Sequence, residues 1–80
     1  MKEMIDVRLS DLSVGDTGRI TRIVGGRGIH KKLAMMGIME GSMIRVIKPA
    51  SSGGPVVIEV GRNSIAIGRG MAQKIYVQLG

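Results

Sequence analysis

Apolar and polar residues alternate along most of this 80-residue chain with a period of two, which is the pattern of strands that bury one face. In the first segment, Ile5, Val7 and Leu9 share one face, and Asp6 and Arg8 lie on the other. The same alternation predicts strands over residues 18–24, 42–48, 56–60, 65–67 and 75–79. We therefore predict five or six short strands joined by tight turns.

The expected turns use many of the 13 glycines, a share about twice the usual one. Ser10 is expected to cap a single helical turn, and residues 13–16 to form a tight turn. Residues 49–55 contain Ser and Gly between two prolines, so we expect a mobile loop there. Residues 61–63 are expected to form a short hairpin turn.

One segment departs from the alternation. Ile29, Leu33 and Met36 lie at positions i, i+4 and i+7, which predicts an apolar stripe along a helix of two to three turns. Gly28 is a candidate N-cap, and Gly37 fits the left-handed residue just past the helix end. Because so short a helix is marginal in water, we expect all three apolar side chains to pack on the sheet. The pattern predicts one mainly β domain over residues 1–80, a closed or partly closed barrel with one inserted helix.

Composition excludes several classes of function. The chain has no cysteine, so it has no disulfide, no thiolate nucleophile and no cysteine-type metal site. Hydrophobic residues make up 44%, enough for a folded domain, but no apolar run approaches the ~20 residues that cross a bilayer. Charged residues interrupt the start of the chain, so we expect no signal peptide. These features predict a soluble, cytoplasmic domain.

No catalytic, cofactor-binding or metal site is predicted. The single histidine, His30, has no second imidazole or nearby carboxylate at ligand spacing, so we expect a surface histidine and no tight Fe²⁺ site. Asp6, Asp11 and Asp16 are expected to be solvated or to cap turns. The basic, glycine-rich residues 25–32 lack the spacing of a phosphate-binding loop in every register. We therefore predict that the chain is not an enzyme.

The charge points to an anionic partner. Twelve Lys and Arg against six Asp and Glu give a net charge of +6. A small β-barrel of the translation type that binds nucleic acid is the alternative that this charge favours. Tyr76 is the only Phe, Tyr or Trp in the chain, however, and single-stranded nucleic acid is usually bound by stacking on such rings. We therefore expect a protein partner and no nucleic acid.

Seven methionines are more than a small core needs. Exposed methionines suit adaptable partner surfaces, because the thioether chain repacks easily. We predict a contact patch for an acidic partner surface, formed by Met35, Met39 and Met43 with a basic rim of Arg27, Lys31 and Lys32. The alternative is that these methionines fill gaps beneath the helix.

A series of apolar and glycine positions runs through nearly the whole chain in a fixed order. It comprises Leu9, Leu12, Gly15-Asp16, Gly18 and Ile20, then Leu33, Met36-Gly37-Ile38 and Gly41, then Ile44 and Val46-Ile47, and finally Gly54 to Val60, Ile65 to Ile67, Ala72, Ile75 and Val77. This order, over residues 7–78, resembles the FeoA family of the bacterial ferrous iron transport system.

The resemblance implies a small SH3-like β-barrel of five to six strands with one short α-helix inserted. It implies transition metal ion binding only as a property of the family, and a non-enzymatic role beside FeoB, a membrane ferrous iron transporter with a cytoplasmic GTP-binding domain. Through protein contact the chain would regulate or assemble that transporter. We expect it in the cytoplasm, at the inner face of the membrane when FeoB holds it there, as a monomer or weak oligomer.

Overall fold

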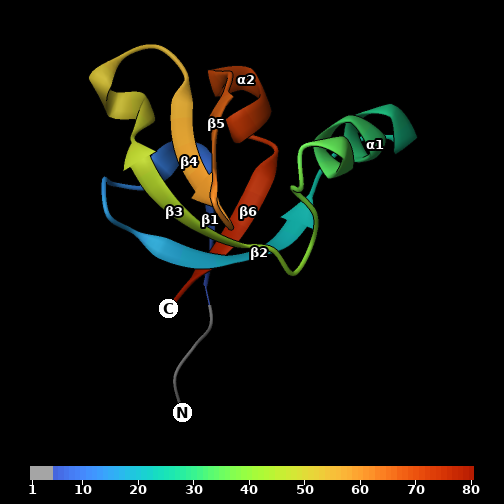
Figure 1. Cartoon of the computed structure of the whole chain (residues 1–80), viewed down its shortest axis with the longest axis horizontal. Helices are drawn as coiled ribbons and strands as arrows, with labels where there is room; N and C mark the ends of the chain where they lie inside the picture. Colours follow the sequence, from blue (N-terminus) through green and yellow to red (C-terminus); the bar gives the residue numbers. More distant parts are fainter. Residues whose placement is uncertain (1–4) are drawn as a thin grey trace.

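The computed structural model describes residues 5–80, in which a six-stranded antiparallel sheet curls around one apolar core (Figure 1). The strands are β1 (Asp6–Arg8), β2 (Thr17–Ile23), β3 (Met43–Lys48), β4 (Val56–Val60), β5 (Asn63–Ile67) and β6 (Ile75–Leu79). The helical elements are α1 (Arg27–Met35), α2 (Arg69–Ala72) and the 3-10 turns η1 (Leu9–Asp11) and η2 (Ala50–Ser52). The strand order is β1-β6-β2-β3-β4-β5, so β1 and β5 form the two edges.

The predicted alternation is confirmed in the core. In β4, for example, Val56 and Ile58 are buried while Val57 and Glu59 are only partly so. The buried apolar residues are Leu9, Leu12, Ile20, Ile23, Leu33, Ile38, Ile44, Val46, Val56, Ile58, Ile67, Ala72, Ile75 and Val77. No polar or charged residue among residues 5–80 is buried with them. Hydrophobic burial therefore provides the main stabilisation of the barrel.

Two features bend the sheet into a barrel. Register shifts occur between Ile20 and Arg22 on β2 and between Val46 and Lys48 on β3, and such bulges increase local twist. Gly18 lets β2 approach β6 closely, because a Cβ at this position would collide with the Gln78 carbonyl oxygen and with Val77. The barrel is only partly closed, since no β1–β5 pairing occurs within residues 5–80.

Several local predictions need correction. Leu9 was expected to continue the first strand, but it begins η1, whose N-cap is Arg8 and which has no side-chain cap from Ser10. The loop over residues 49–55 contains the ordered turn η2. A second, four-residue helix, α2, precedes β6 and packs Ala72 into the core. None of the helices in residues 5–80 is long and apolar enough to cross a membrane.

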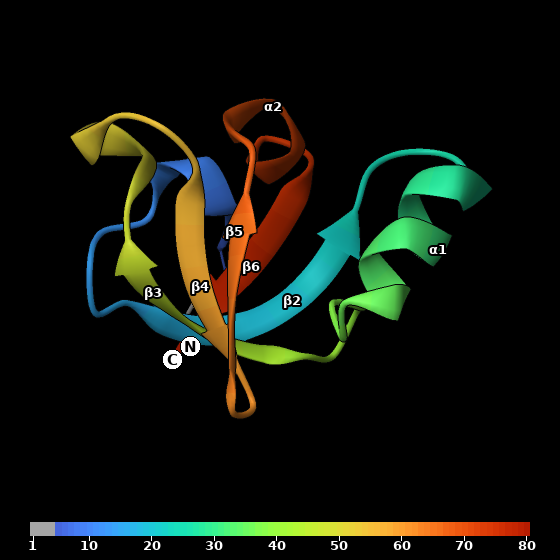
Figure 2. The same ribbon diagram turned by 45° about the horizontal axis from the view of Figure 1, so that its top comes forward.

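Helix α1 projects from one side of the barrel (Figure 2). Its N-cap is Gly26, two residues earlier than expected, whereas Gly37 has the predicted left-handed conformation at φ 81°. Leu33 is buried and Ile29 is half-buried against the core, as predicted. Met36 is 37% exposed, so the prediction that it packs on the sheet is wrong. The helix ends at Met35, and Met36 has already left helical geometry.

Candidate protein-contact site

A side-chain hydrogen bond from His30 stabilises the first turn of helix α1. His30 Nδ1 donates a hydrogen bond of 2.9 Å to the Gly26 carbonyl oxygen, which also accepts the His30 backbone N–H at 3.2 Å. His30 is partly exposed at the surface. No group of three potential metal ligands occurs among His, Asp and Glu of the described chain. The observed role of His30 is therefore to fix the first turn of α1.

One face of α1 is basic and exposed. Arg27, Lys31 and Met35 lie at i, i+4 and i+8, a spacing that places side chains along the same face of a helix. All three are exposed, and Met35 is 80% accessible. The helix contains no acidic residue to balance its cations. This half of the predicted contact patch thus forms a continuous surface that ends in an apolar side chain.

The connection from α1 to β3 presents Met39 on an ordered turn. Ser42 Oγ accepts a hydrogen bond from the Met39 N–H at 3.1 Å and donates one to the Gly37 carbonyl at 3.2 Å. The Gly41 N–H donates to the Ile20 carbonyl at 2.7 Å, which ties this turn to β2. Met39 remains half-exposed at the surface. The turn therefore holds an exposed methionine in a defined place.

The other two members of the predicted patch lie in different hollows. Met43 pairs with Arg19 across β2 and β3, and these two residues line a shallow hollow together with Leu79. Lys32 faces instead a groove between α1 and the barrel. The structure thus brings Arg27, Lys31 and Met35 together on one helix face, whereas Met39 lies on the following turn and Met43 and Lys32 line two different hollows.

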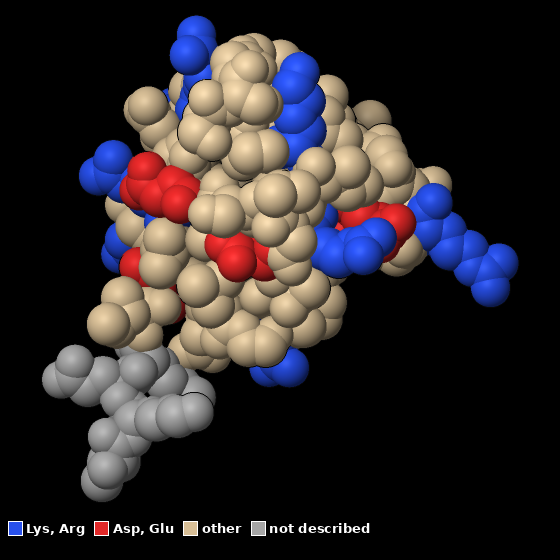
Figure 3. Space-filling view, turned by 90° about the vertical axis from the view of Figure 1, so that its left-hand side faces the viewer, with Lys and Arg blue, Asp and Glu red and all other residues tan. Residues whose placement is uncertain are grey.

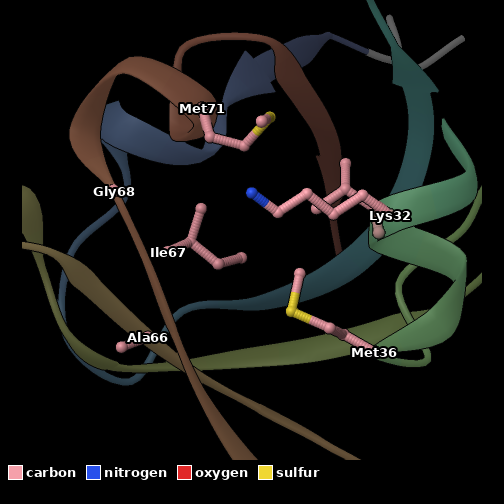
Figure 4. Close-up of a pocket in the computed structure, with 7 residues that line it drawn as sticks. Lys32, Met36, Ala66, Ile67, Gly68 and Met71 are labelled. Carbon is pink, nitrogen blue, oxygen red and sulfur yellow. The ribbon is translucent and has the colours of Figure 1, made fainter. Parts of the chain in front are cut away.

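The groove beside Lys32 was not predicted from the sequence. It has a volume of about 170 Å³, and Figure 4 shows the Lys32 amine reaching into it between Met36 and Met71. Its lining residues are Lys32, Leu33, Met36, Ala66, Ile67, Gly68 and Met71. They come from α1, from the end of β5 and from α2, three segments that only the fold brings together.

Charges differ around the molecule. On the face opposite α1, basic and acidic side chains are interspersed (Figure 3). An ion pair of 3.2 Å joins Arg45 of β3 to Glu59 of β4, both substantially exposed. The predicted turn role of Asp16 is confirmed, since its Oδ2 accepts the Ser13 N–H at 2.8 Å. The surface around α1 is therefore a better candidate than the opposite face for contact with an acidic partner.

A row of side chains on β1, β6 and β2 covers the only tyrosine. Arg8 and Arg22 are the register partners of Tyr76 on its two sides, and the Arg22 guanidinium lies 4.5 Å from the ring centroid. A hydrogen bond from Arg8 lowers the pKa of Tyr76, and the positive charges of Arg8 and Arg22 act in the same direction. The ring is thus already stacked with a cation of its own chain.

This architecture, a small partly closed barrel with one inserted helix, belongs to the SH3-like class of domains. The FeoA domain model matches residues 7–79, and the chain belongs to the FeoA family. That family comprises accessory proteins of ferrous iron transport and is not a known enzyme family. The expected family and its SH3-like fold are therefore confirmed.

Individual relatives agree with this assignment. The chain is 41% identical over 64 residues to a Methanocaldococcus jannaschii protein named Fe(2+) transport protein A, covering 80% of this chain and 76% of that one. A crystal structure of an iron uptake regulatory protein, FeoA, superposes with a TM-score of 0.87 at 36% identity, over 95% of this chain and 100% of that one. The fold also matches a Stenotrophomonas maltophilia FeoA, described as an SH3 domain protein complexed with zinc, with a TM-score of 0.74 at 20% identity, over 92% and 89% of the two chains.

Proposed function

We propose that this chain is a non-enzymatic regulatory or assembly module that contacts a FeoB-type ferrous iron transporter. The contact is made on the cytoplasmic side, next to the GTP-binding domain of the transporter, which places the chain in the cytoplasm. Family membership supports the link to ferrous iron transport. The role in protein contact is supported by the surface of α1.

A single observation carries this proposal: α1 is held to the barrel by few apolar side chains and leaves the others outside. Leu33 is its one fully buried residue, while Met35 is 80% exposed next to Lys31 and Arg27. An exposed thioether costs little to repack against a partner. The surrounding cations set the orientation and rate of association with an acidic surface. This combination fits a docking surface better than a structural helix.

The direct test is co-purification with the transporter, in the presence and absence of a guanine nucleotide. We expect the wild-type chain to be retained, and Arg27→Glu/Lys31→Glu to be lost. Met39→Glu tests the methionine part of the surface in the same way. Retention of all variants at the wild-type level would show that the contact lies elsewhere on the barrel.

The control is Lys48→Glu. It reverses one charge at the end of β3, which lies on the far side of the barrel from α1 in Figure 2. Lys48 is exposed, so its replacement leaves the core intact. We expect this variant to bind as the wild type does. If it binds as weakly as the helix variant, the net charge and not the α1 surface governs association.

Nucleic-acid binding is the second candidate, because the net charge of +6 favours it. The covered ring of Tyr76 argues against it, since Arg22 occupies the face on which a base would stack. A salt titration separates the two candidates. Binding to RNA would weaken by orders of magnitude between about 50 and 200 mM salt. If the chain still binds the transporter at about 200 mM salt but binds no RNA, protein contact is favoured.

A further inference from the structure

The two edges of the sheet are protected to different degrees. Edge strand β1 has only three residues, and its Asp6 and Arg8 are charged and exposed. Edge strand β5 has five residues, none charged and none proline, and it pairs with β4 in an unbroken register. Short length, charge, proline and bulges are the usual devices that block pairing with another chain. β1 has two of these devices, whereas β5 has none.

The groove described above lies directly beside β5. Ala66, Ile67 and Gly68 form its barrel side, and Figure 4 shows Ile67 pointing toward the side chains of α1. Its volume of about 170 Å³ is similar to that of cavities of about 150 Å³ that hold a benzene-sized group. The groove therefore has room for one medium-sized apolar side chain, next to a strand edge with free backbone groups.

The positive charge of Lys32 makes this groove favour an acidic occupant. Its amine reaches into the groove between two thioethers, those of Met36 and Met71 (Figure 4). Within residues 5–80 the ion pair is Arg45–Glu59, so Lys32 has no carboxylate partner there. A cation at the rim of an apolar pocket favours an occupant that carries a carboxylate beside its apolar side chain.

We propose that the groove binds an extended, acidic segment of a partner protein, which adds as a strand to the free edge of β5. One apolar side chain of the segment enters the groove against Ile67 and Met71, and a carboxylate of the segment pairs with the Lys32 amine. Main-chain hydrogen bonds to β5 supply affinity in this mode, and the pocket supplies specificity. The identification of the partner as the transporter rests on the proposed function. The chemistry of the bound segment rests on the residues that line the groove.

A second copy of the chain is a poorer occupant. Each copy carries a net charge of +6, which opposes association. Antiparallel pairing of two β5 strands about Ile65 would bring Arg62 of one copy beside Gly68 of the other, next to its Arg69. An acidic partner segment turns these same charges into favourable contacts. Charge complementarity therefore selects the acidic segment.

The test uses the full chain and a short synthetic peptide with Leu at its centre, Val and Thr around it, and Glu and Asp at its ends. Binding is followed by amide chemical shifts and by hydrogen exchange. We expect shifts and added protection to concentrate on residues 63–67. A peptide with Lys in place of Glu and Asp, and another with Gly in place of Leu, are expected not to bind.

Two lysine-to-glutamate changes provide matched variants. Lys32→Glu reverses the charge inside the groove and is expected to weaken the peptide about tenfold or more. Lys48→Glu makes the same change at an exposed position of β3 that does not line the groove, and is expected to leave peptide affinity unchanged. Equal weakening by both variants, or shifts that avoid residues 63–67, would overturn the inference. So would sedimentation showing that a second copy pairs through β5 and excludes the peptide.

The transporter experiment separates this inference from the proposed function. If the transporter binds the wild type and Lys32→Glu equally, the groove is not its docking site, while the proposed function stands. If the transporter fails to bind but the acidic peptide binds in the groove, the groove chemistry stands and the proposed partner is wrong. Competition between the peptide and the transporter for the wild-type chain is the result expected when both are right.

Discussion

The barrel buries apolar side chains from β2, β3, β4, β5 and β6, whereas α1 buries Leu33 and leaves Met35 and Met36 exposed. Both regions contain several apolar residues, but only in the barrel do most of them point into the core. Its strands also share backbone hydrogen bonds with neighbours, while α1 stands apart from the sheet in Figure 2. The difference teaches that this fold concentrates apolar burial in one region and leaves apolar side chains exposed in another.

That division follows from short length. A domain of this size has a small core, so most of the stabilising burial must come from the barrel. A nine-residue helix adds little stability by itself and needs packing to persist. Such weakly attached elements are the parts of proteins that adapt to partners. The predictions below test how separate the two regions are.

The largest effect is expected from the barrel. Ile58 of β4 is fully buried, so Ile58→Ala leaves a cavity that its neighbours cannot easily fill. We expect a loss of about 2–5 kcal/mol in the free energy of unfolding, measured by denaturant titration. All probes should report one transition. A loss below about 1 kcal/mol would mean that the barrel core relaxes as freely as a surface site.

Leu33→Ala is the corresponding change in α1. Leu33 is buried but borders the open groove, so part of the space it leaves can be filled by Met36 or by water. We expect a loss near the lower end of the same range, about 2 kcal/mol. Hydrogen exchange should show lost protection within residues 27–38 while the strands stay protected. Equal loss of protection in the strands would show that α1 and the barrel unfold as one unit.

The barrel could be predicted from the sequence because its strands bury one face. The alternation alone predicts that Val56 and Ile58 are buried, as they are. Gly37 likewise has the left-handed conformation expected just past a helix end. The partial opening between β1 and β5 depends on register shifts in β2 and β3, which local alternation does not encode. The short helix α2 was also unpredictable, because tertiary packing of Ala72 stabilises a helical turn that propensity does not favour.

The candidate site was only half visible in the sequence. Helical spacing alone places Arg27, Lys31 and Met35 on one face. The groove has no such signature, because Lys32 and Met71 are far apart in sequence and meet only when α2 folds against the barrel. One sequence signal bore on the position of Met36. This third residue of the apolar stripe lies just before Gly37, the glycine at the helix end, so it falls outside the regular helix.

Two glycine-to-alanine changes sharpen the comparison, and the first is in the barrel. Gly18→Ala puts a Cβ against the Gln78 carbonyl and 2.6 Å from Val77 Cγ1, so β2 and β6 must move apart. We expect a loss of about 1–3 kcal/mol in the free energy of unfolding, as for other overpacked sites. Thermal unfolding is the measurement. An unchanged midpoint would show that the β2–β6 contact yields without cost.

Gly28→Ala is the matched change in α1 and should have the opposite sign. A Cβ on Gly28 meets no atom within 4 Å, and the residue lies inside the helix. Alanine restricts the unfolded chain and favours the helix, which should stabilise α1 by about 0.5–1 kcal/mol. We expect slower hydrogen exchange within residues 27–35 and little change in the strands. Slower exchange everywhere would again indicate a single cooperative unit.

The smallest effect concerns the outer surface of the barrel, where Arg8 and Arg22 flank Tyr76. The hydrogen bond from Arg8 lowers the pKa of Tyr76 below 10.0, so the tyrosinate is favoured in the folded chain. Because the unfolded chain still binds this proton when the folded chain has lost it, this group makes stability rise as pH increases between the lowered pKa and the ordinary value. Ultraviolet titration reads the pKa directly, since the chain has one tyrosine. Arg8→Met should raise the titration midpoint of Tyr76 toward 10.0, while Lys31→Glu on α1 should leave it unchanged. A shift in both variants would mean that overall charge sets this titration, and not the strand pairing of Arg8 with Tyr76.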